Sequence, residues 1–295
     1  MPGRSSAFLA RTVERIPSRW RTDLNLWIDF FALINLTFLS LDIYIAHSTN
    51  NFGNRAEFIP LIFSLAAPLL LIPALIAREL LRRTGIWSVI GYIVGGLSIV
   101  IGLAGVVYHL DSQFFYERTL RSLTYAAPFA APLAYTGIGM LLVMNRMVPQ
   151  DSEEWAQWVL LLTLGGFFGN FVLSLTDHAT NGFFSSAEWI PVVSAAFGVA
   201  FLAMPFMRRV DTRYLGVCGV VLVAQIVVGV LGFVLHGLAD VHGPSRNLMD
   251  NVIYGAPPFA PLLFPNLALL GCIGLWALRL HVSPGPDKQA IATDY

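Results

Sequence analysis

The chain has 295 residues, of which 56% are hydrophobic and 12% are charged, and its 18 basic side chains balance its 18 acidic ones. Soluble proteins carry about twice that share of charged residues, so this composition excludes a soluble globular protein. The balanced charge, with no basic stripe, also excludes a nucleic-acid partner. Because the hydrophobic residues fall in long runs, we expect the lipid bilayer to be the main surrounding of the chain.

Eight hydrophobic runs are long enough to cross about 30 Å of hydrocarbon, which takes about 20 helical residues. They lie at 25–46, 58–77, 86–109, 128–147, 155–177, 189–207, 214–236 and 258–280. A lipid-exposed backbone must satisfy its own hydrogen bonds, and no alternating pattern of a barrel is present. The runs therefore predict an all-α, polytopic membrane protein with eight transmembrane helices.

The segments outside the spans have their own patterns. Residues 1–24 form a polar segment before the first span, and within it 5–21 mix large apolar residues with arginines, which predicts an interfacial helix. The tail, 283–295, contains two prolines and little to bury, so we expect it to be disordered.

Basic residues are unevenly divided between the two sides of the predicted spans. The terminal segments and alternate connections hold 14, at Arg4, Arg11, Arg15, Arg19, Arg21, Arg78, Arg82, Arg83, Arg146, Arg208, Arg209, Arg213, Arg279 and Lys288. The other connections hold four, at Arg55, Arg118, Arg121 and Arg246. The positive-inside rule then predicts cytoplasmic termini. The excess of arginine over lysine is typical of GC-rich bacterial genomes, so we expect the bacterial inner membrane.

The chain also repeats itself. The segment 47–60 aligns without a gap to 178–191, and eight of the fourteen positions are identical. The segment 125–133 likewise resembles 254–262. Equivalent positions are separated by four spans, and an even number makes the copies parallel. The sequence therefore predicts a first four-helix repeat at 25–148 and a second at 149–282.

The repeat places one histidine at the outer end of every odd-numbered span, at His47, His109, His178 and His236. Ionisable groups at this depth are costly unless they are paired, which favours a functional site. Single histidines would also suit an anchoring role among headgroups, but four at repeat-related positions, each with an acidic neighbour in sequence, favour ligands.

Acidic and amide residues accompany these histidines in the outer loops. Glu57 and Glu188 occur at equivalent positions before the second and sixth spans, and we expect them to act as co-ligands or proton carriers. Further candidates for cofactor binding or for orienting the histidines are Asn50, Asn181, Asp111 and Asp240.

Imidazole is the commonest protein ligand of zinc, copper and iron, so the cluster predicts a transition metal (Fe, Cu or Zn) or haem. Two arrangements are open: one histidine pair in each repeat, or all four histidines at one centre. The repeated glutamates favour a mixed nitrogen and oxygen site, or proton delivery beside a cofactor. We therefore expect extracytoplasmic redox or metal-assisted chemistry, such as that of a membrane oxidoreductase, with an electron-transfer or membrane subunit as partner.

Other functions fit parts of the pattern. Parallel repeats also build transporters of small solutes or ions, and proline-rich re-entries could break the fourth and eighth helices. A structural or assembly subunit of the membrane is a further alternative. The layout of eight spans in two four-helix units resembles that of the haem A synthases. This resemblance is one of layout, because the local motifs of that family are absent, and it assigns no role to any residue.

Overall fold

The computed structural model describes residues 23–81 and 83–282, which are helical apart from short connections and contain no strand. This confirms the all-α prediction for the described part of the chain. The predicted interfacial helix and the predicted disordered tail lie outside the described residues.

The helices follow the same order in the two parts of the chain. The first part contains α2 (Leu24–Ser48), η1 (Arg55–Glu57), α3 (Phe58–Glu79), α4 (Thr84–Asp111), α5 (Phe114–Glu117), α6 (Leu120–Tyr125) and α7 (Leu133–Met147). The second part contains α8 (Glu153–Thr180), η2 (Ser186–Glu188), α9 (Trp189–Met207), α10 (Thr212–Val241), α11 (Leu248–Tyr254), η3 (Ala260–Leu262) and α12 (Leu263–Arg279).

Within 23–81 and 83–282, seven helical segments are long and apolar enough to cross a membrane, and they include every predicted span except the fourth. The fourth run, 128–147, forms a turn followed by α7, which has 15 residues. At about 1.5 Å per residue, α7 is shorter than the hydrocarbon core of a typical bilayer. The chain is therefore a multi-pass membrane protein by length and composition, with seven clear spans.

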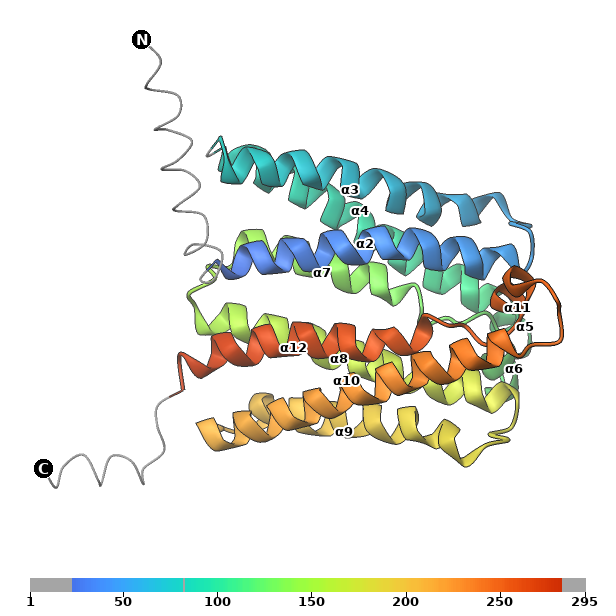
Figure 1. The fold of residues 1–295 in the computed structure, drawn as a ribbon. Helices are drawn as coiled ribbons and strands as arrows, with labels where there is room; N and C mark the ends of the chain where they lie inside the picture. Colours follow the sequence, from blue (N-terminus) through green and yellow to red (C-terminus); the bar gives the residue numbers. More distant parts are fainter. Residues whose placement is uncertain (1–22, 82, 283–295) are drawn as a thin grey trace, which may run out of the picture.

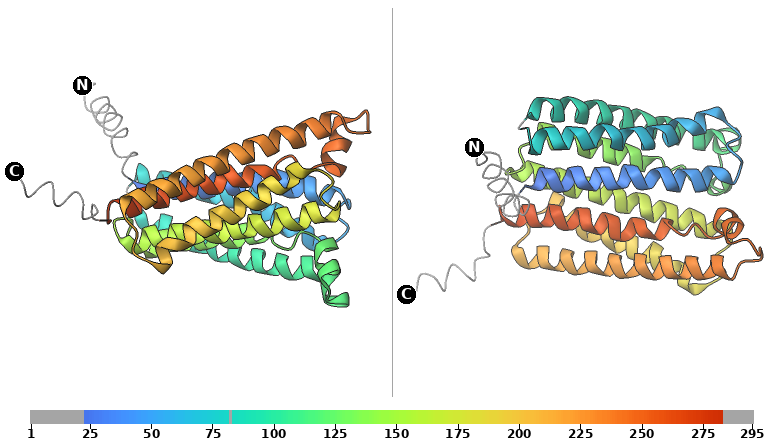
Figure 2. Two further views of the ribbon diagram at one scale, coloured as in Figure 1. Left: turned by 90° about the horizontal axis from the view of Figure 1, so that it is seen from below. Right: turned by 45° about the horizontal axis from the view of Figure 1, so that its top comes forward.

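The long helices lie side by side in two groups of four (Figure 1). One group contains α2, α3, α4 and α7, and the other contains α8, α9, α10 and α12; the groups lie beside one another in Figure 2 as well. Both described ends, at 23 and 282, lie at the same end of the bundle (Figure 1). The outer loops with the candidate residues lie at the opposite end.

A buried core joins the two groups. Its side chains come from α2 and α7 of the first group, such as Ile28 and Leu141, and from α8 and α12 of the second, such as Trp155 and Phe264. The outer helices leave large apolar side chains exposed, and Leu69 on α3 and Val220 on α10 are 71% and 70% exposed. Exposed apolar surface of this extent fits contact with lipid.

One polar contact crosses the interface between the groups near mid-span. The Nδ2 of Asn35 on α2 donates to Oδ1 of Asn266 on α12 at 3.1 Å, and Nδ2 of Asn266 donates back to Oδ1 of Asn35 at 2.6 Å. Reciprocal amide bonds of this kind satisfy both side chains within an apolar surrounding.

Candidate histidine pairs at the outer end

His47 and His178 lie in the last turns of α2 and α8, and both helices end in the same way. Phe52 and Phe183 both have a φ of 52°, in the left-handed region that large side chains seldom adopt. Their backbone N–H groups donate to the carbonyls of His47 and His178 at 3.0 Å. The helix ends are thus closed by a left-handed residue, which turns the chain back toward the histidine.

The returning chain brings a glutamate beside each of these histidines. The short helices η1 and η2 are capped by Asn54 and Ser185, whose side chains accept from the N–H two residues later. Each short helix ends at its glutamate. Oε2 of Glu57 and of Glu188 then lies 3.5 Å from Nδ1 of the histidine that precedes it by ten residues.

The first glutamate has an additional partner. Nδ2 of Asn50 donates to Oε1 of Glu57 at 2.9 Å, whereas the equivalent Asn181 makes no such bond to Glu188 in the described structure. Glu188 is the more buried of the two glutamates, at 8% exposure. The two sites therefore differ in how the carboxylate is held.

His109 and His236 lie near the ends of α4 and α10, which pack tightly against the proline turns before α7 and α12. Glycine permits this approach, because a Cβ at Gly105 would lie 2.7 Å from Cβ of Pro132, and one at Gly232 would lie 2.8 Å from Cβ of Pro261. Each glycine precedes its histidine by about one helical turn. The close packing therefore fixes the depth and direction of each histidine.

The same turns supply a partner for each of these histidines. Nδ1 of His109 bonds the carbonyl oxygen of Pro128 at 2.9 Å, and Nδ1 of His236 bonds that of Pro257 at 2.8 Å. Because a carbonyl only accepts, Nδ1 must carry the proton in both rings. The proline-rich segments were noticed in the sequence as possible helix breaks, but their role as histidine partners was missed.

The histidines meet in pairs within each group of four helices. The ring centroids of His47 and His109 are 6.2 Å apart at an interplanar angle of 78°, and those of His178 and His236 are 6.4 Å apart at 87°. All four side chains are partly buried. Of the two arrangements that the sequence left open, the structure has the pair within each half.

The four histidines and the glutamates do not gather into one larger centre. Within 23–81 and 83–282, no group of three or more His, Cys, Asp or Glu residues could hold a metal ion. Of the other candidates, Asp111 ends α4 and is exposed, with no hydrogen bond or ion pair, while Asp240 is buried in a different pocket. A centre made of several protein ligands is thus not preformed in the described residues.

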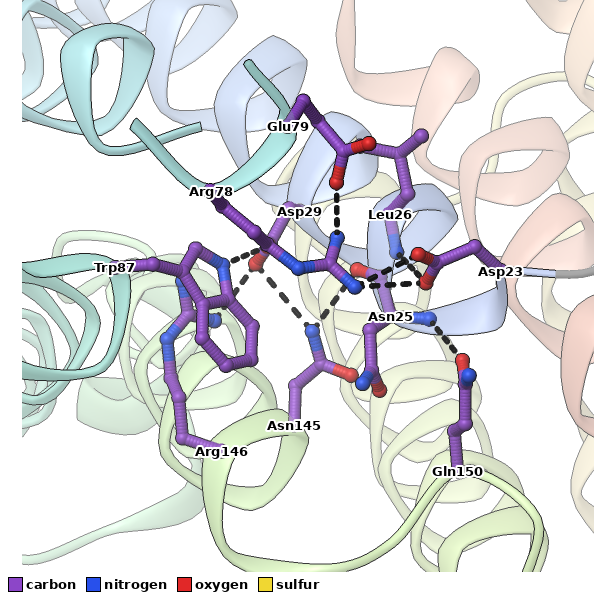
Figure 3. Close-up of polar contacts among 10 residues, drawn as sticks. All are labelled: Asp23, Asn25, Leu26, Asp29, Arg78, Glu79, Trp87, Asn145, Arg146 and Gln150. Atoms are coloured by element: carbon purple, nitrogen blue, oxygen red, sulfur yellow. Dashed lines mark hydrogen bonds and ion pairs between the residues drawn. The ribbon is translucent and has the colours of Figure 1, made fainter. Parts of the chain in front are cut away.

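A second polar cluster lies at the opposite end of the first group and was not predicted. Asp29, which is isolated in sequence, accepts hydrogen bonds from Trp87, Asn145 and Arg146 (Figure 3). Nearby, Arg78 donates two bonds to Asp23 at 2.8 and 2.9 Å. The four elements that meet here, α2, α3, α4 and α7, are thereby tied together at the end away from the histidines.

No protein-family model matches the chain, and comparisons with curated proteins and with solved structures gave no match.

Proposed function

We propose that this protein is a membrane haem protein that binds one haem in each group of four helices, between His47 and His109 and between His178 and His236. The observation that carries the proposal is the geometry of the two pairs. A metal ion binds an imidazole nitrogen at about 2.0–2.1 Å, so two imidazoles on opposite sides of one ion have centroids about 6 Å apart. The separations of 6.2 and 6.4 Å agree with this arrangement.

The state of the ring nitrogens supports the same role. In all four rings, Nδ1 faces an oxygen acceptor, either a proline carbonyl or a glutamate carboxylate. Histidines that bind metals commonly donate their other ring N–H to such an acceptor, which fixes the tautomer and the ring orientation. Each Nε2 is then left as the nitrogen able to bind a metal.

The number of ligands favours haem over a bare transition metal. Structural zinc takes four protein ligands and catalytic zinc takes three, whereas haem iron can be held by one or two protein side chains, because the porphyrin supplies its other ligands. Each site offers two imidazoles, and the glutamate faces the nitrogen that would not bind the metal. The glutamates thereby have a task beside haem: they orient His47 and His178 and add negative charge.

Bound haem would supply one-electron chemistry at both sites. The residues of this chain would tune it: in each pair, Nδ1 of one histidine bonds a neutral carbonyl, while Nδ1 of the other lies 3.5 Å from a carboxylate oxygen. A carboxylate makes the imidazole a stronger donor and stabilises the oxidised iron. We infer transfer of electrons to a membrane or extracytoplasmic partner.

The proposal includes the finer topology. We infer eight spans in two parallel repeats, with α7 as the fourth span, because α7 packs among the long helices and the elements follow the same order in both halves. The basic residues favour the end opposite the histidines as the cytoplasmic side. Both termini would then be cytoplasmic, and the bacterial inner membrane is the location that the composition favours.

The decisive experiment is to purify the protein in detergent from cells supplied with a haem precursor and to record visible spectra with a haem assay. We expect a Soret band and two haems per chain. The variants His109→Ala and His236→Ala should each lose one haem and keep the other, because each belongs to a different pair. His242→Ala is the matched control, since its side chain bonds only the carbonyl of Leu238.

A folded protein that is colourless after this supply would overturn the haem proposal. A stoichiometric amount of zinc, copper or iron without a Soret band would point instead to the mixed metal site, provided that His109→Ala and His236→Ala lose this metal. Transport has less support, because some polar side chains within the spans bond one another, as Ser194 and Gln225 do at 2.9 Å.

A further inference from the structure

Asp240 lies near the end of α10 and is the most buried carboxylate of the outer loops, at 3% exposure. No side chain donates a hydrogen bond to Oδ1 or Oδ2; the groups that favour the charged carboxylate are the backbone N–H of Ala256 and the imidazole of His236. An ionised carboxylate with so few donors is costly to bury, and an accompanying cation would lower that cost.

The carboxylate of Asp240 lines a pocket of about 300 Å³ that the last outer loop forms against the end of α10. The pocket contains a second carboxylate, a hydroxyl, an amide and a phenol but no basic side chain. Its walls are Ala239, Asp240, Gly243, Pro244, Ser245, Asp250, Asn251, Tyr254, Gly255 and Ala256. The polar atoms at this site are therefore mostly oxygen acceptors, which suit a hard cation and repel an anion.

The loop that encloses the pocket is held in place by its own hydrogen bonds. Asn251 is buried, and its Nδ2 donates to the carbonyls of Asp240 at 2.9 Å and Ser245 at 3.0 Å. Oγ of Ser245 donates to Oδ2 of Asp250 at 3.1 Å. These bonds hold Asp250 and Asn251 in place on the wall of the pocket, and none of them goes to the side-chain oxygens of Asp240.

Glycine lets the loop pack directly against the buried carboxylate. A Cβ atom at Gly255 would lie 2.7 Å from Oδ1 of Asp240, closer than real Cβ contacts. The loop backbone therefore approaches this oxygen with no side chain between them. The pocket combines a rigid loop with a buried carboxylate to which no side chain donates.

We propose that this pocket binds a calcium ion, with Asp240 and Asp250 as its charged ligands and with the hydroxyl of Ser245, loop carbonyls and water completing an all-oxygen sphere. Calcium takes six to eight oxygen ligands in flexible geometry, which an irregular loop can provide, whereas magnesium demands a near-ideal octahedron. The ion would neutralise the buried carboxylate and fasten the loop to α10. The lining of the pocket includes none of the four histidines, although Asp240 interacts electrostatically with His236.

The test uses the full-length protein in detergent, stripped with a chelator. Calcium is titrated through about 10⁻⁵–10⁻² M, the range of weak extracellular sites, while thermal unfolding is followed. We expect the unfolding midpoint of the wild type to rise by about 2–5 °C at saturating calcium and much less with magnesium. Terbium emission sensitised by Tyr254, which lines the pocket, should appear and be displaced by calcium.

Two variants assign the site, because Asp240→Asn alone could fail to fold. Asp240→Asn and Asp250→Asn should each weaken the apparent affinity for calcium, measured from the rise in unfolding midpoint, at least tenfold. Asp111→Asn, which changes an exposed carboxylate at the end of α4, should leave this affinity unchanged. A wild-type protein with neither a calcium-dependent midpoint nor displaceable terbium emission overturns the proposal. So does retention of both signals in the two pocket variants. Neither readout depends on haem, so this site and the histidine pairs can fail independently.

Discussion

Asp29 and Arg146, 117 residues apart in the sequence, form an ion pair that is closed to solvent: Oδ1 and Nη1 are 2.6 Å apart, and the side chains are 2% and 0% exposed. The guanidinium of Arg146 also lies 4.4 Å from the centroid of the Trp87 ring (Figure 3). Its Nε and Nη2 have no hydrogen-bond partner. The buried positive charge of Arg146 is thus compensated mainly by the carboxylate of Asp29.

Removal of either partner is expected to be strongly destabilising. Asp29→Asn or Arg146→Met leaves an uncompensated buried charge, and such changes cost about 3–5 kcal/mol. Thermal unfolding in detergent, followed by circular dichroism, should show a markedly lower midpoint for both. Arg279→Met, at an exposed arginine near the same end, is the control and should shift the midpoint little.

The double variant Asp29→Leu with Arg146→Leu should recover most of the loss. Apolar residues of similar volume often replace a buried ion pair without loss of stability. The second half of the chain supports this choice. In the repeat, Leu160 stands at the position equivalent to Asp29, and Leu275 stands at the position equivalent to Arg146; both leucines are buried in the core. A double variant as unstable as the single ones would contradict this account of the pair.

The reciprocal bonds between Asn35 and Asn266 predict a coupled effect on how the two halves associate. Asn35→Leu or Asn266→Leu leaves one half-buried amide without its partner, and hydrogen bonds between membrane helices contribute about 0.6–2 kcal/mol. Each single variant should lower stability in that range. The double variant should lose less than the sum, because no amide is then left unpaired, and a double-variant cycle of unfolding midpoints measures this coupling. Additive losses would show that the two amides act separately.

Much of the fold could be predicted from composition and periodicity. The hydrophobic runs predicted each of the seven membrane-length helical segments in the described residues. The helix in the fourth run proved shorter, because the first residues of that run form the proline turn before α7. Such turns are difficult to place from sequence, since their residues are as apolar as the helix that follows. The repeated segments likewise drew attention to the four histidines.

The partners in space could not be predicted. The carbonyl of Pro128 as a partner of His109 depends on how closely two helices approach, and a backbone carbonyl leaves no signal in the side-chain sequence. Arg146 seemed to be one of the basic residues that mark the cytoplasmic side, and only the packing of α2 and α4 against α7 shows that it is paired with Asp29. The pair of Asp29 and Arg146 has no counterpart in the second half, where Leu160 and Leu275 stand at the equivalent positions, so the repeat could not reveal it.

The difference between Asn50 and Asn181 provides a test of the first histidine pair with a built-in control. Asn50→Ala removes the hydrogen bond to Glu57 and the one that Asn50 accepts from the backbone N–H of Phe52, while Asn181→Ala removes no bond to Glu188. In the haem-loaded protein, a freed Glu57 would hold Nδ1 of His47 less firmly, so we expect the reduction potential of one haem to change in Asn50→Ala and neither to change in Asn181→Ala. Equal shifts in both variants would contradict a role through Glu57. Redox titration of the visible spectrum measures both.

The approach of α4 to the proline turn before α7 predicts opposite results for two glycines on one helix. A Cβ at Gly102 would lie 2.8 Å from the carbonyl oxygen of Pro132 and 2.6 Å from the backbone nitrogen of Thr136, so Gly102→Ala must push the helices apart. Overpacking of this kind costs about 1–3 kcal/mol. Because His109 lies two turns later on α4, its bond to Pro128 should also lengthen.

Gly96→Ala is the matched control: nothing lies within 4 Å of its Cβ, and alanine favours a helix by about 0.5–1 kcal/mol over glycine. We therefore expect a lower unfolding midpoint and a weaker first cofactor site in Gly102→Ala, with an unchanged or slightly higher midpoint in Gly96→Ala. If Gly102→Ala is as stable as the wild type, the close contact between α4 and the proline turn is not what positions His109.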